Sequence, residues 1–398
     1  MNPEFLPASG ASRTVSIGDV VTEAGVTIFD AELRYFAFYD SPEGAADYAE
    51  FSAGPEAGLS PEDRPIVLIE HALTGDGNAA DWWADMVGPN KPIDTTRYLV
   101  LCANVLGGCQ GSTGPSSPHP DGQAWGSRFP GLSIRDMVTA ERLLLERVGV
   151  TKIHAMIGAS MGGARVLEWS LMYPEMVNAA LPIAVSARAS AWQIGLQSSQ
   201  IRFIEADPAW QGGDYYDTGV VPSHGLGQAR RIAHLTYRGE LEVDERFGVD
   251  PQNGENPYGP YRDPHQRFAV ESYLDRQAEK LVARFDAGSY VVLTDALNRH
   301  DVGRGRGGMN AALGSCEVPT MVVGVDTDIL YPLHQQEHLS RNLGDFIGMS
   351  KITSPTGHDG FLIESRQMGQ ALAKFLAKAK IIAEGTEGAE GNEGAARS

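Results

Sequence analysis

Short apolar segments recur along the chain, and polar residues do not alternate within them. They occupy residues 64–71, 97–104, 152–158, 178–185, 318–326 and 350–355. Strands that are covered on both faces have this pattern, as in a parallel sheet. Helix-like segments lie between or after them, at residues 133–149, 161–173, 334–344 and 361–382. This alternation predicts an α/β fold with a mostly parallel central sheet and helices on both of its faces.

Two other regions depart from this rhythm. Residues 26–40 have a β-rich composition and predict an opening hairpin, whereas residues 41–63 are rich in Gly, Pro, Ala and acidic residues and predict a loop. Residues 186–310 contain helical stretches with polar and basic faces. The chain is therefore expected to consist of an α/β core (1–185 and 311–382), a helical lid insertion (186–310) and a disordered low-complexity tail (383–398).

The composition is that of a globular protein, with 398 residues of which 42% are hydrophobic and 21% charged. A net charge of −19 argues against binding nucleic acid or anionic lipid, because both are polyanions. A small anionic substrate remains possible, since a local basic pocket can oppose the global charge.

The three cysteines, Cys102, Cys109 and Cys316, form no C-x-x-C pair, and no secretory segment follows Met1. These features predict a reduced, cytoplasmic protein. No apolar run approaches the roughly 18 residues that a membrane span needs. We therefore expect no membrane association.

The segment MIGASMGG (156–163) places Ser160 between Gly158 and Gly162, after a predicted strand and before a predicted helix. The pattern G-x-S-x-G in this context is typical of a nucleophile elbow, in which a tight turn lifts the serine hydroxyl above the sheet of an α/β-hydrolase fold. The glycines are needed because side chains at 158 and 162 would clash. A turn used only for packing is the alternative.

A serine hydroxyl needs a base, and in this fold the acid and then the histidine follow the serine along the chain. His358 lies in a Gly-flanked loop after the last predicted strand. The segment GVDTDILYP supplies two candidate acids, Asp326 and Asp328, and Asp328 is favoured because it is further from the strand end. A turn-forming Asp and a loop-bonding His are the structural alternatives.

The oxyanion of an acyl-transfer intermediate needs two fixed N–H donors. The amide of Met161, directly after the nucleophile, is one candidate. The other is expected in the loop after an early strand, where the amide of Leu73 in HALTGD is favoured.

These stretches together resemble the homoserine O-acetyltransferase family of the α/β-hydrolase superfamily, particularly its actinobacterial form. The resemblance covers roughly residues 15–378 and rests on HALTGD (71–76), NVLGGCQGSTGPSS (104–117), GASMGGARVLEW (158–169), SARASAWQIGLQ (186–197), RRIAHLTYRGE (230–240), RFDAGSYVVLTDAL (284–297), GVDTDILYP (324–332) and GHDGFL (357–362).

The resemblance implies a catalytic triad of Ser160, Asp328 and His358. It also implies homoserine contacts from Arg230, Tyr237 and Asp359. Acetyl-CoA would be the acyl donor and L-homoserine the acceptor, with no cofactor and no metal, and the product would feed methionine synthesis. A homodimer built through the lid helices is implied as well.

The chemistry of an amino-acid acceptor agrees with these contacts. Arg230 can hold its carboxylate with two parallel hydrogen bonds, and Asp359 can hold its ammonium beside His358. Without the resemblance, a solvated helix charge, an aromatic at the core edge and a loop cap would be preferred for Arg230, Tyr237 and Asp359.

The expected reaction is ping-pong acyl transfer through Ser160, with the lid insertion excluding water. Three alternatives stay open: a transferase that uses succinyl-CoA or L-serine, a plain hydrolase, and a binding protein without activity. His334 and His338 are four residues apart, but HQQEH lacks the H-E-x-x-H pattern of a zinc site. The Gly-rich segment 104–117 lacks a P-loop lysine and is expected to lie beside the active-site entrance.

Overall fold

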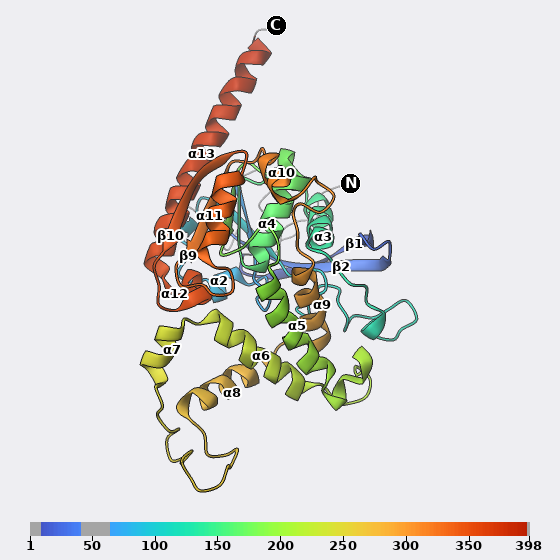
Figure 1. The fold of residues 1–398 in the computed structure, drawn as a ribbon. Coiled ribbons are helices and arrows are strands. Elements are labelled where there is room, and N and C mark those ends of the chain that lie inside the picture. Colours follow the sequence, from blue (N-terminus) through green and yellow to red (C-terminus); the bar gives the residue numbers. More distant parts are fainter. Residues whose placement is uncertain (1–8, 41–63, 396–398) are drawn as a thin grey trace.

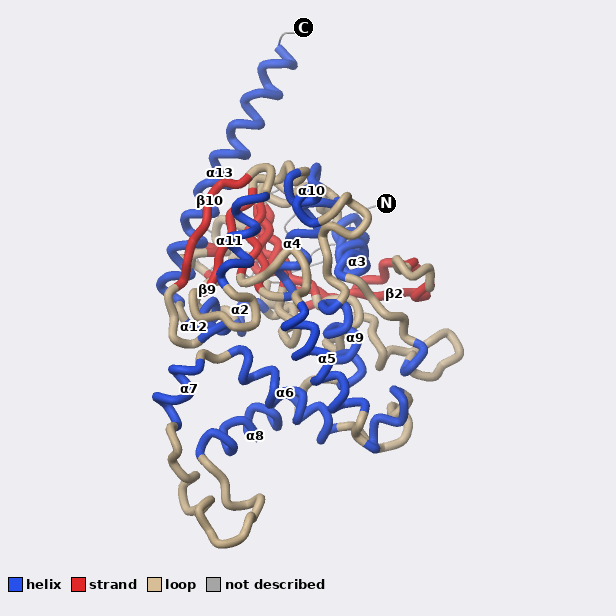
Figure 2. Tube along the Cα trace, viewed as in Figure 1, coloured by secondary structure: helices blue, strands red, loops and turns tan. Residues whose placement is uncertain are grey.

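The computed structural model describes residues 9–40 and 64–395, so the loop predicted at 41–63 lies outside the described residues. An eight-stranded sheet runs through the body of the molecule (Figures 1 and 2), in the order β1-β2-β6-β3-β7-β8-β9-β10. These strands are β1 (Ser12–Val21), β2 (Thr27–Phe38), β3 (Ile66–Glu70), β6 (Leu99–Ala103), β7 (Ala155–Ala159), β8 (Ala180–Ile183), β9 (Thr320–Val325) and β10 (Phe346–Ile352).

The direction of the strands agrees with the prediction. β1 and β2 form an antiparallel hairpin, and β2 pairs antiparallel with β6. From β6 to β10 every neighbouring pair is parallel. A separate short parallel pair joins β4 (Val87–Gly88) to β5 (Ile93–Asp94). The α/β fold class and the mostly parallel sheet are thereby confirmed.

The buried strands contribute to two cores because successive side chains point to opposite faces of a sheet. In β3, Leu68 belongs to one core, and Val67 and Ile69 belong to the other. The first core is covered by α3 (Ile134–Arg147), α4 (Met161–Met172) and α11 (Leu333–Asn342), and the second by α2 (Ala79–Trp82), α12 (Gly360–Ile363) and α13 (Ser365–Ala395). Strands covered on both faces explain the unbroken apolar segments of the sequence.

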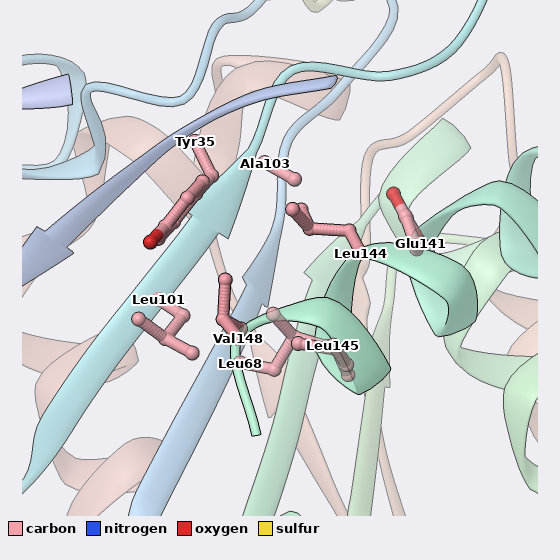
Figure 3. A pocket seen from close by; sticks show the side chains of 8 residues that line it. All are labelled: Tyr35, Leu68, Leu101, Ala103, Glu141, Leu144, Leu145 and Val148. Atoms are coloured by element: carbon pink, nitrogen blue, oxygen red, sulfur yellow. The ribbon is translucent and has the colours of Figure 1, made fainter. Parts of the chain in front are cut away.

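A small pocket remains between α3 and the sheet (Figure 3). Its lining is apolar except for Tyr35 and Glu141, and it includes Leu68 and Leu101 from the strands and Leu144 from α3. The pocket therefore lies inside the core, between α3 and the strands β3 and β6.

The predicted helix at 133–149 is α3, and its start follows the expected signal. The Ser133 hydroxyl accepts a hydrogen bond from the Asp136 amide at 3.2 Å, and the Asp136 carboxylate accepts one from the Ser133 amide at 2.7 Å. This reciprocal capping box satisfies two amide groups that a helix start otherwise leaves without partners.

The segment predicted as an insertion is mainly helical, and its helices lie below the sheet in Figure 1. They are α5 (Ala191–Glu205), α6 (Ser223–Tyr237), α7 (Glu240–Phe247), α8 (Ala269–Val282) and α9 (Ala287–Asn298). The chain then returns to the core through α10 (Met309–Gly314).

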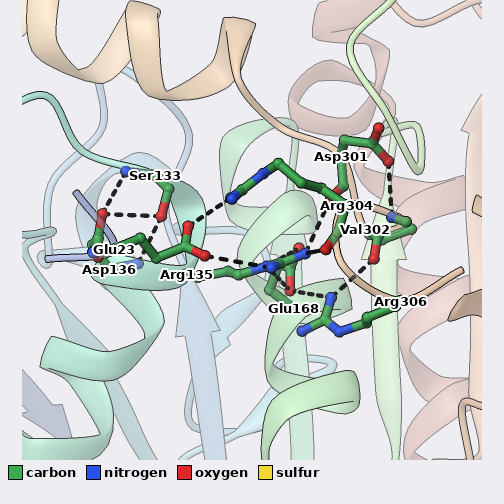
Figure 4. Close-up of polar contacts among 10 residues, drawn as sticks. Glu23, Ser133, Arg135, Asp136, Glu168, Asp301, Val302, Arg304 and Arg306 are labelled. Carbon is green, nitrogen blue, oxygen red and sulfur yellow. Dashed lines mark hydrogen bonds and ion pairs between the residues drawn. The ribbon is translucent and has the colours of Figure 1, made fainter. Parts of the chain in front are cut away.

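Ion pairs and hydrogen bonds hold the segment just before α10, which contains Arg304 and Arg306, on the core helices (Figure 4). Glu168 of α4 is 2.7 Å from Nη1 of Arg306 and 3.2 Å from Nε of Arg135 on α3. Arg135 also donates to the carbonyl oxygen of Arg304 at 2.8 Å. The end of the insertion is therefore anchored on α3 and α4.

The C-terminal helix differs from its predicted end. We expected a helix to residue 382 and disorder over 383–398, whereas α13 continues to Ala395. The buried start of α13 supplies the costly helix nucleus, and continuing an existing helix costs less than starting one, even though residues 383–395 contain four glycines. No helix in the described part of the chain is long and apolar enough to cross a membrane.

Candidate active site

The turn at Ser160 has the geometry that the sequence predicted. Ser160 adopts a φ of 56°, which is uncommon for a residue with a side chain, and its amide donates to the carbonyl oxygen of Ile183 at 2.9 Å. A Cβ on Gly158 would meet the backbone of Gly162 at 2.5 Å, and a Cβ on Gly162 would overlap the carbonyl oxygen of Glu70. Glycine at both positions lets the turn pack directly on β3.

The candidate acid and the candidate base meet in the loops that follow β9 and β10. Nδ1 of His358 is 2.6 Å from Oδ2 of Asp328, and both side chains are buried. Oδ1 of Asp328 accepts hydrogen bonds from the amides of Leu330 and Tyr331, each at 2.8 Å. The other candidate, Asp326, instead accepts from the Ser354 amide at 3.1 Å. The pairing thus selects Asp328.

The environment of His358 changes its protonation. Burial would lower the pKa of this imidazole, but the charge and hydrogen bond of Asp328, together with the nearby Asp359, raise it above its ordinary value. In the described residues, Ser160 forms no hydrogen bond with His358. Such bonds are often long in ligand-free enzymes and tighten when substrate binds.

Two aromatic residues that the sequence analysis did not select also hold His358. The ring of Tyr331 stacks on the imidazole with centroids 5.4 Å apart, and Phe361 meets it edge-on at 5.6 Å. Each follows a selected residue, Asp328 or His358, by three positions. Burial and the charge of Asp328 raise the pKa of Tyr331, while a contact with the Ser160 hydroxyl opposes this rise.

The N–H groups of Met161 and Leu73 are the two predicted oxyanion donors. Met161 is the first residue of α4, and Leu73 follows β3 in the loop that begins at His71. Among the described residues, neither amide donates to a protein acceptor. Leu73 also lines a small pocket with Gly108 and Cys109 of the Gly-rich segment, which therefore lies next to this loop.

The insertion brings Arg230 and Tyr237 of α6 to the His358 loop. The end of α6 packs backbone against backbone on this loop, because a Cβ on Gly239 would overlap the carbonyl oxygen of Pro355. The ring of Tyr237 lies 5.8 Å from the His358 imidazole, centroid to centroid, and the guanidinium of Arg230 is 5.4 Å from the centre of the Tyr237 ring.

Arg230 is a cation without a carboxylate partner in the described residues. Its Nε and Nη1 atoms are buried and form no hydrogen bond. Burial raises the pKa of Asp359, and the charges of His358, Arg230 and Arg238 oppose this rise. Nη1 of Arg238 is 3.8 Å from Oδ2 of Asp359. One unpaired cation and one carboxylate therefore face the same space beside His358.

The described residues contain no group of three or more His, Cys, Asp and Glu side chains that could hold a metal. His334 is exposed on α11, and His338 lies one turn further along that helix. All three cysteines are free thiols.

Comparisons with known proteins agree with this geometry. The family profile described as the alpha/beta hydrolase fold matches residues 65–365. The chain is 97% identical over 386 residues to a homoserine O-acetyltransferase of Corynebacterium jeikeium, which covers 97% of this chain and 98% of that relative. A homoserine O-acetyltransferase of Corynebacterium glutamicum is 61% identical over 372 residues, 94% of this chain and 95% of the relative.

Two solved structures share the fold. The homoserine O-acetyltransferase of Bacillus anthracis has a TM-score of 0.78 at 22% identity, over 92% of this chain and 97% of that one. An acetylester hydrolase of Corynebacterium glutamicum has a TM-score of 0.74 at 22% identity, over 92% and 96%. The sequence relatives decide the family that the fold alone leaves open: the chain belongs to the homoserine O-acetyltransferase family of α/β hydrolases.

Proposed function

We propose that this protein transfers the acetyl group of acetyl-CoA to the hydroxyl of L-homoserine through an acyl-enzyme on Ser160, in methionine biosynthesis. The observation that carries the proposal is the unpaired guanidinium of Arg230 beside the buried His358–Asp328 pair. An ester hydrolase needs the triad alone. A half-buried cation with two unpaired nitrogen atoms suits an acceptor that carries a carboxylate.

In the first half-reaction, His358 takes the proton of Ser160 as Oγ attacks the thioester carbonyl carbon. The new C–O bond forms, and the negative charge on the carbonyl oxygen is stabilised by the N–H groups of Met161 and Leu73. The C–S bond then breaks, and the proton on His358 passes to the sulfur of CoA. Asp328 holds the imidazole in the required orientation and stabilises its charged form.

In the second half-reaction, L-homoserine binds with its carboxylate on Arg230 and its ammonium on Asp359, while Tyr237 borders the acceptor. The half-buried carboxyl of Asp359 has a raised pKa, so a ligand cation would stabilise its ionised form. His358 removes the hydroxyl proton of the acceptor, the oxygen attacks the acyl-enzyme, and Ser160 recovers its proton. No cofactor takes part in either step.

Water is the competing nucleophile for the acyl-enzyme. The helical insertion over the His358 loop supports transfer over hydrolysis, because covering the site reduces the access of water. A homologous hydrolase would use the same Ser160, Asp328 and His358, so the acceptor residues make the difference.

The experiment that tests the function is thiol release from acetyl-CoA with and without L-homoserine, with L-serine and succinyl-CoA in parallel. We expect release to require both acetyl-CoA and homoserine, and Ser160→Ala to abolish it while the circular-dichroism spectrum stays unchanged. Equal release without an acceptor would instead establish a hydrolase. Preference for succinyl-CoA or L-serine would keep the mechanism and change the substrates.

We also propose a cytoplasmic homodimer that forms through the helices of the insertion. Large apolar side chains are exposed there, including Trp192 (57%) on α5, Leu235 (45%) on α6 and Leu241 (75%) on α7. Apolar side chains gathered on one part of a surface mark an interaction site more often than isolated ones do. The three free thiols agree with a reducing compartment.

A further inference from the structure

A buried ionic cluster lies directly behind the turn at Ser160. Arg165 of α4 is fully buried, and Glu70 at the end of β3 and Glu141 of α3 are each 2% exposed. Nη1 of Arg165 is 2.6 Å from Oε2 of Glu70 and also bonds to Oε1 of Glu141. The indole N–H of Trp169 donates to Oε2 of Glu141 at 3.1 Å. One cation and two carboxyl groups thus share a space that water does not reach.

Burial works against the charged form of Glu70. It raises the pKa of Glu70 well above its ordinary value, the charge of Arg165 opposes this rise, and Glu141 adds to it. Glu141 also borders the apolar pocket of Figure 3. Buried ion pairs of this kind are often no more stabilising than apolar side chains of the same size, so stability alone does not explain the cluster.

The cluster is connected to the loop that carries Leu73. Nη2 of Arg165 donates to the carbonyl oxygen of His71 at 2.7 Å. The His71 ring is held at both nitrogens: Nδ1 lies 2.8 Å from the carbonyl oxygen of Ala72, and Nε2 accepts the Val105 amide at 3.1 Å. Burial and the charge of Arg165 lower the pKa of His71 to about 3, so the ring stays neutral with its proton on Nδ1.

These contacts determine the direction of the Leu73 amide. The carbonyl of Ala72 and the N–H of Leu73 belong to one planar trans peptide, so they point in opposite directions. The Ala72 oxygen accepts hydrogen bonds from the His71 ring and from the Gly75 amide, the latter at 2.8 Å. Fixing this oxygen aims the Leu73 N–H. Arg165 fixes the preceding carbonyl, and it belongs to the same helix that begins at Met161.

We propose that Arg165 is a positioning residue for the oxyanion hole. It joins the loop of Leu73 to the helix of Met161, and the Glu70–Glu141 pair holds its guanidinium in place. The proposal rests on the oxyanion role that the proposed function gives to these two amides. Arg165 does not touch substrate, so its effect is on the spacing and direction of the two donors.

The test compares Arg165→Gln and Arg165→Lys with Glu168→Gln. Glu168 lies on the same helix and is also buried and ion-paired, but it contacts Arg135 and Arg306 instead of the loop. Three quantities are measured: kcat of homoserine-dependent thiol release, KM for homoserine, and the inhibition constant of methylboronic acid. This boronate forms a tetrahedral serine adduct whose oxygen occupies the oxyanion hole.

We expect Arg165→Gln to lower kcat by about tenfold or more, since losing one oxyanion donor outright costs about 10²–10³. The inhibition constant of the boronate should rise by a similar factor, and KM for homoserine should stay within about twofold. Arg165→Lys keeps the charge but cannot reach both the carboxylate and the His71 oxygen in the same geometry. It should fold and lose part of kcat, whereas Glu168→Gln should lose melting temperature only.

A folded Arg165→Gln with wild-type kcat and boronate affinity would overturn the proposal. If that variant does not fold, full kcat in Arg165→Lys would overturn it equally. So would a Glu168→Gln variant that loses kcat and boronate affinity to the same extent, because general destabilisation would then explain the effect. Failure of the proposed function is distinguishable, because it would appear as wild-type protein without homoserine-dependent release. In that case the hydrolysis rates of the same variants would be compared with p-nitrophenyl acetate, an ester that acylates the serine without needing homoserine.

Discussion

Single residues at the reacting centre derive their properties from their neighbours. His358 is buried, which alone would make it a weaker base, but its contact with Asp328 at 2.6 Å reverses this effect. Arg230 is the opposite case, because its buried Nε and Nη1 have no partner among the described residues. The His358–Asp328 pair satisfies its charges without a ligand, whereas Arg230 has buried donors without an acceptor. Substitutions at the two sites should therefore have different consequences.

Asp328→Asn should lower kcat by about 10²–10⁴, the range known for triads whose acid is made neutral. In the wild type, kcat/KM for acetyl-CoA should rise with pH through one ionisation above about 6.5, the ordinary histidine value, because the base must be neutral. In the variant this ionisation should shift to lower pH. A pH–rate profile of both proteins measures it, and an unshifted profile would contradict the assignment.

The same pKa shift has a definite sign for stability. Folded His358 binds its proton more tightly than it does in the unfolded chain, because its pKa is raised. Its contribution to the free energy of unfolding is therefore fully present below the unfolded pKa, and it is lost as pH rises through the folded pKa. Asp328→Asn should weaken this dependence.

Arg230→Gln should raise KM for homoserine by about tenfold or more while the burst of thiol from the acylation step stays within about twofold, because the residue serves the acceptor only. Removing a half-buried charge that has no carboxylate partner should leave the melting temperature equal or higher. Stopped-flow thiol detection and calorimetry measure the two effects. Arg230→Lys keeps the charge without the paired donors and should recover only part of the affinity. A KM equal to that of the wild type would remove Arg230 from the acceptor site.

At the scale of elements, the site depends on close approaches of backbone. The turn between β7 and α4 packs on β3 at Gly162, and the end of α6 packs on the His358 loop at Gly239. Both contacts bring chain segments together that a Cβ would separate. The positions of Ser160 and Arg230 relative to His358 therefore depend on glycines that have no chemistry of their own.

Gly162→Ala should destabilise the protein by about 1–3 kcal/mol, the usual cost of overpacking, because its Cβ would overlap the Glu70 carbonyl. Gly195→Ala is the matched control: Gly195 lies inside α5 with nothing within 4 Å of an added Cβ. That variant should gain about 0.5–1 kcal/mol, since Ala favours a helix interior over Gly. Urea unfolding measures the free energy of unfolding of both variants. A Gly162→Ala variant as stable as the wild type would mean that the β3 backbone moves to make room for the added Cβ.

At the scale of the whole molecule, residues 186–310 have two kinds of surface. One packs on the loop of His358, where Gly239 approaches Pro355 and Tyr237 approaches the imidazole. The other exposes apolar side chains to solvent, including Leu241 at 75%. Ion pairs between Glu168, Arg135 and Arg306 hold the end of the insertion on the core, as Figure 4 shows.

The protein should behave in solution as a dimer, with twice the 42.8 kDa mass of one chain. Leu241→Asp should weaken the dimer by burying a charge in its interface and shift the mass toward the monomer. Light scattering coupled to size exclusion measures both. Asp19→Asn, on the hairpin far from the insertion helices along the chain, is the control and should leave the mass unchanged. A wild-type mass equal to one chain would exclude the homodimer.

The sequence by itself determined the order of the elements and predicted the residues of the site. Unbroken apolar segments identified the buried parallel strands, and Gly158 and Gly162 around Ser160 identified the turn, because local backbone geometry restricts these residue types. The chain order expected of a Ser, acid and His triad predicted His358 and favoured Asp328, and the structure places these two side chains 2.6 Å apart. Local pattern also misplaced an end: α13 continues to Ala395 because a buried helix already provides its nucleus.

Only the tertiary structure decided which of these groups meet. Whether Asp326 or Asp328 pairs with His358 depends on loop geometry beyond β9, and the unpaired state of Arg230 depends on the packing of α6. Arg165 carried no signal in the sequence, because a buried cation is recognised only by its partners Glu70, Glu141 and His71, which are distant along the chain. Contacts of this kind depend on burial and on distance in space, and the local sequence pattern determines neither of them.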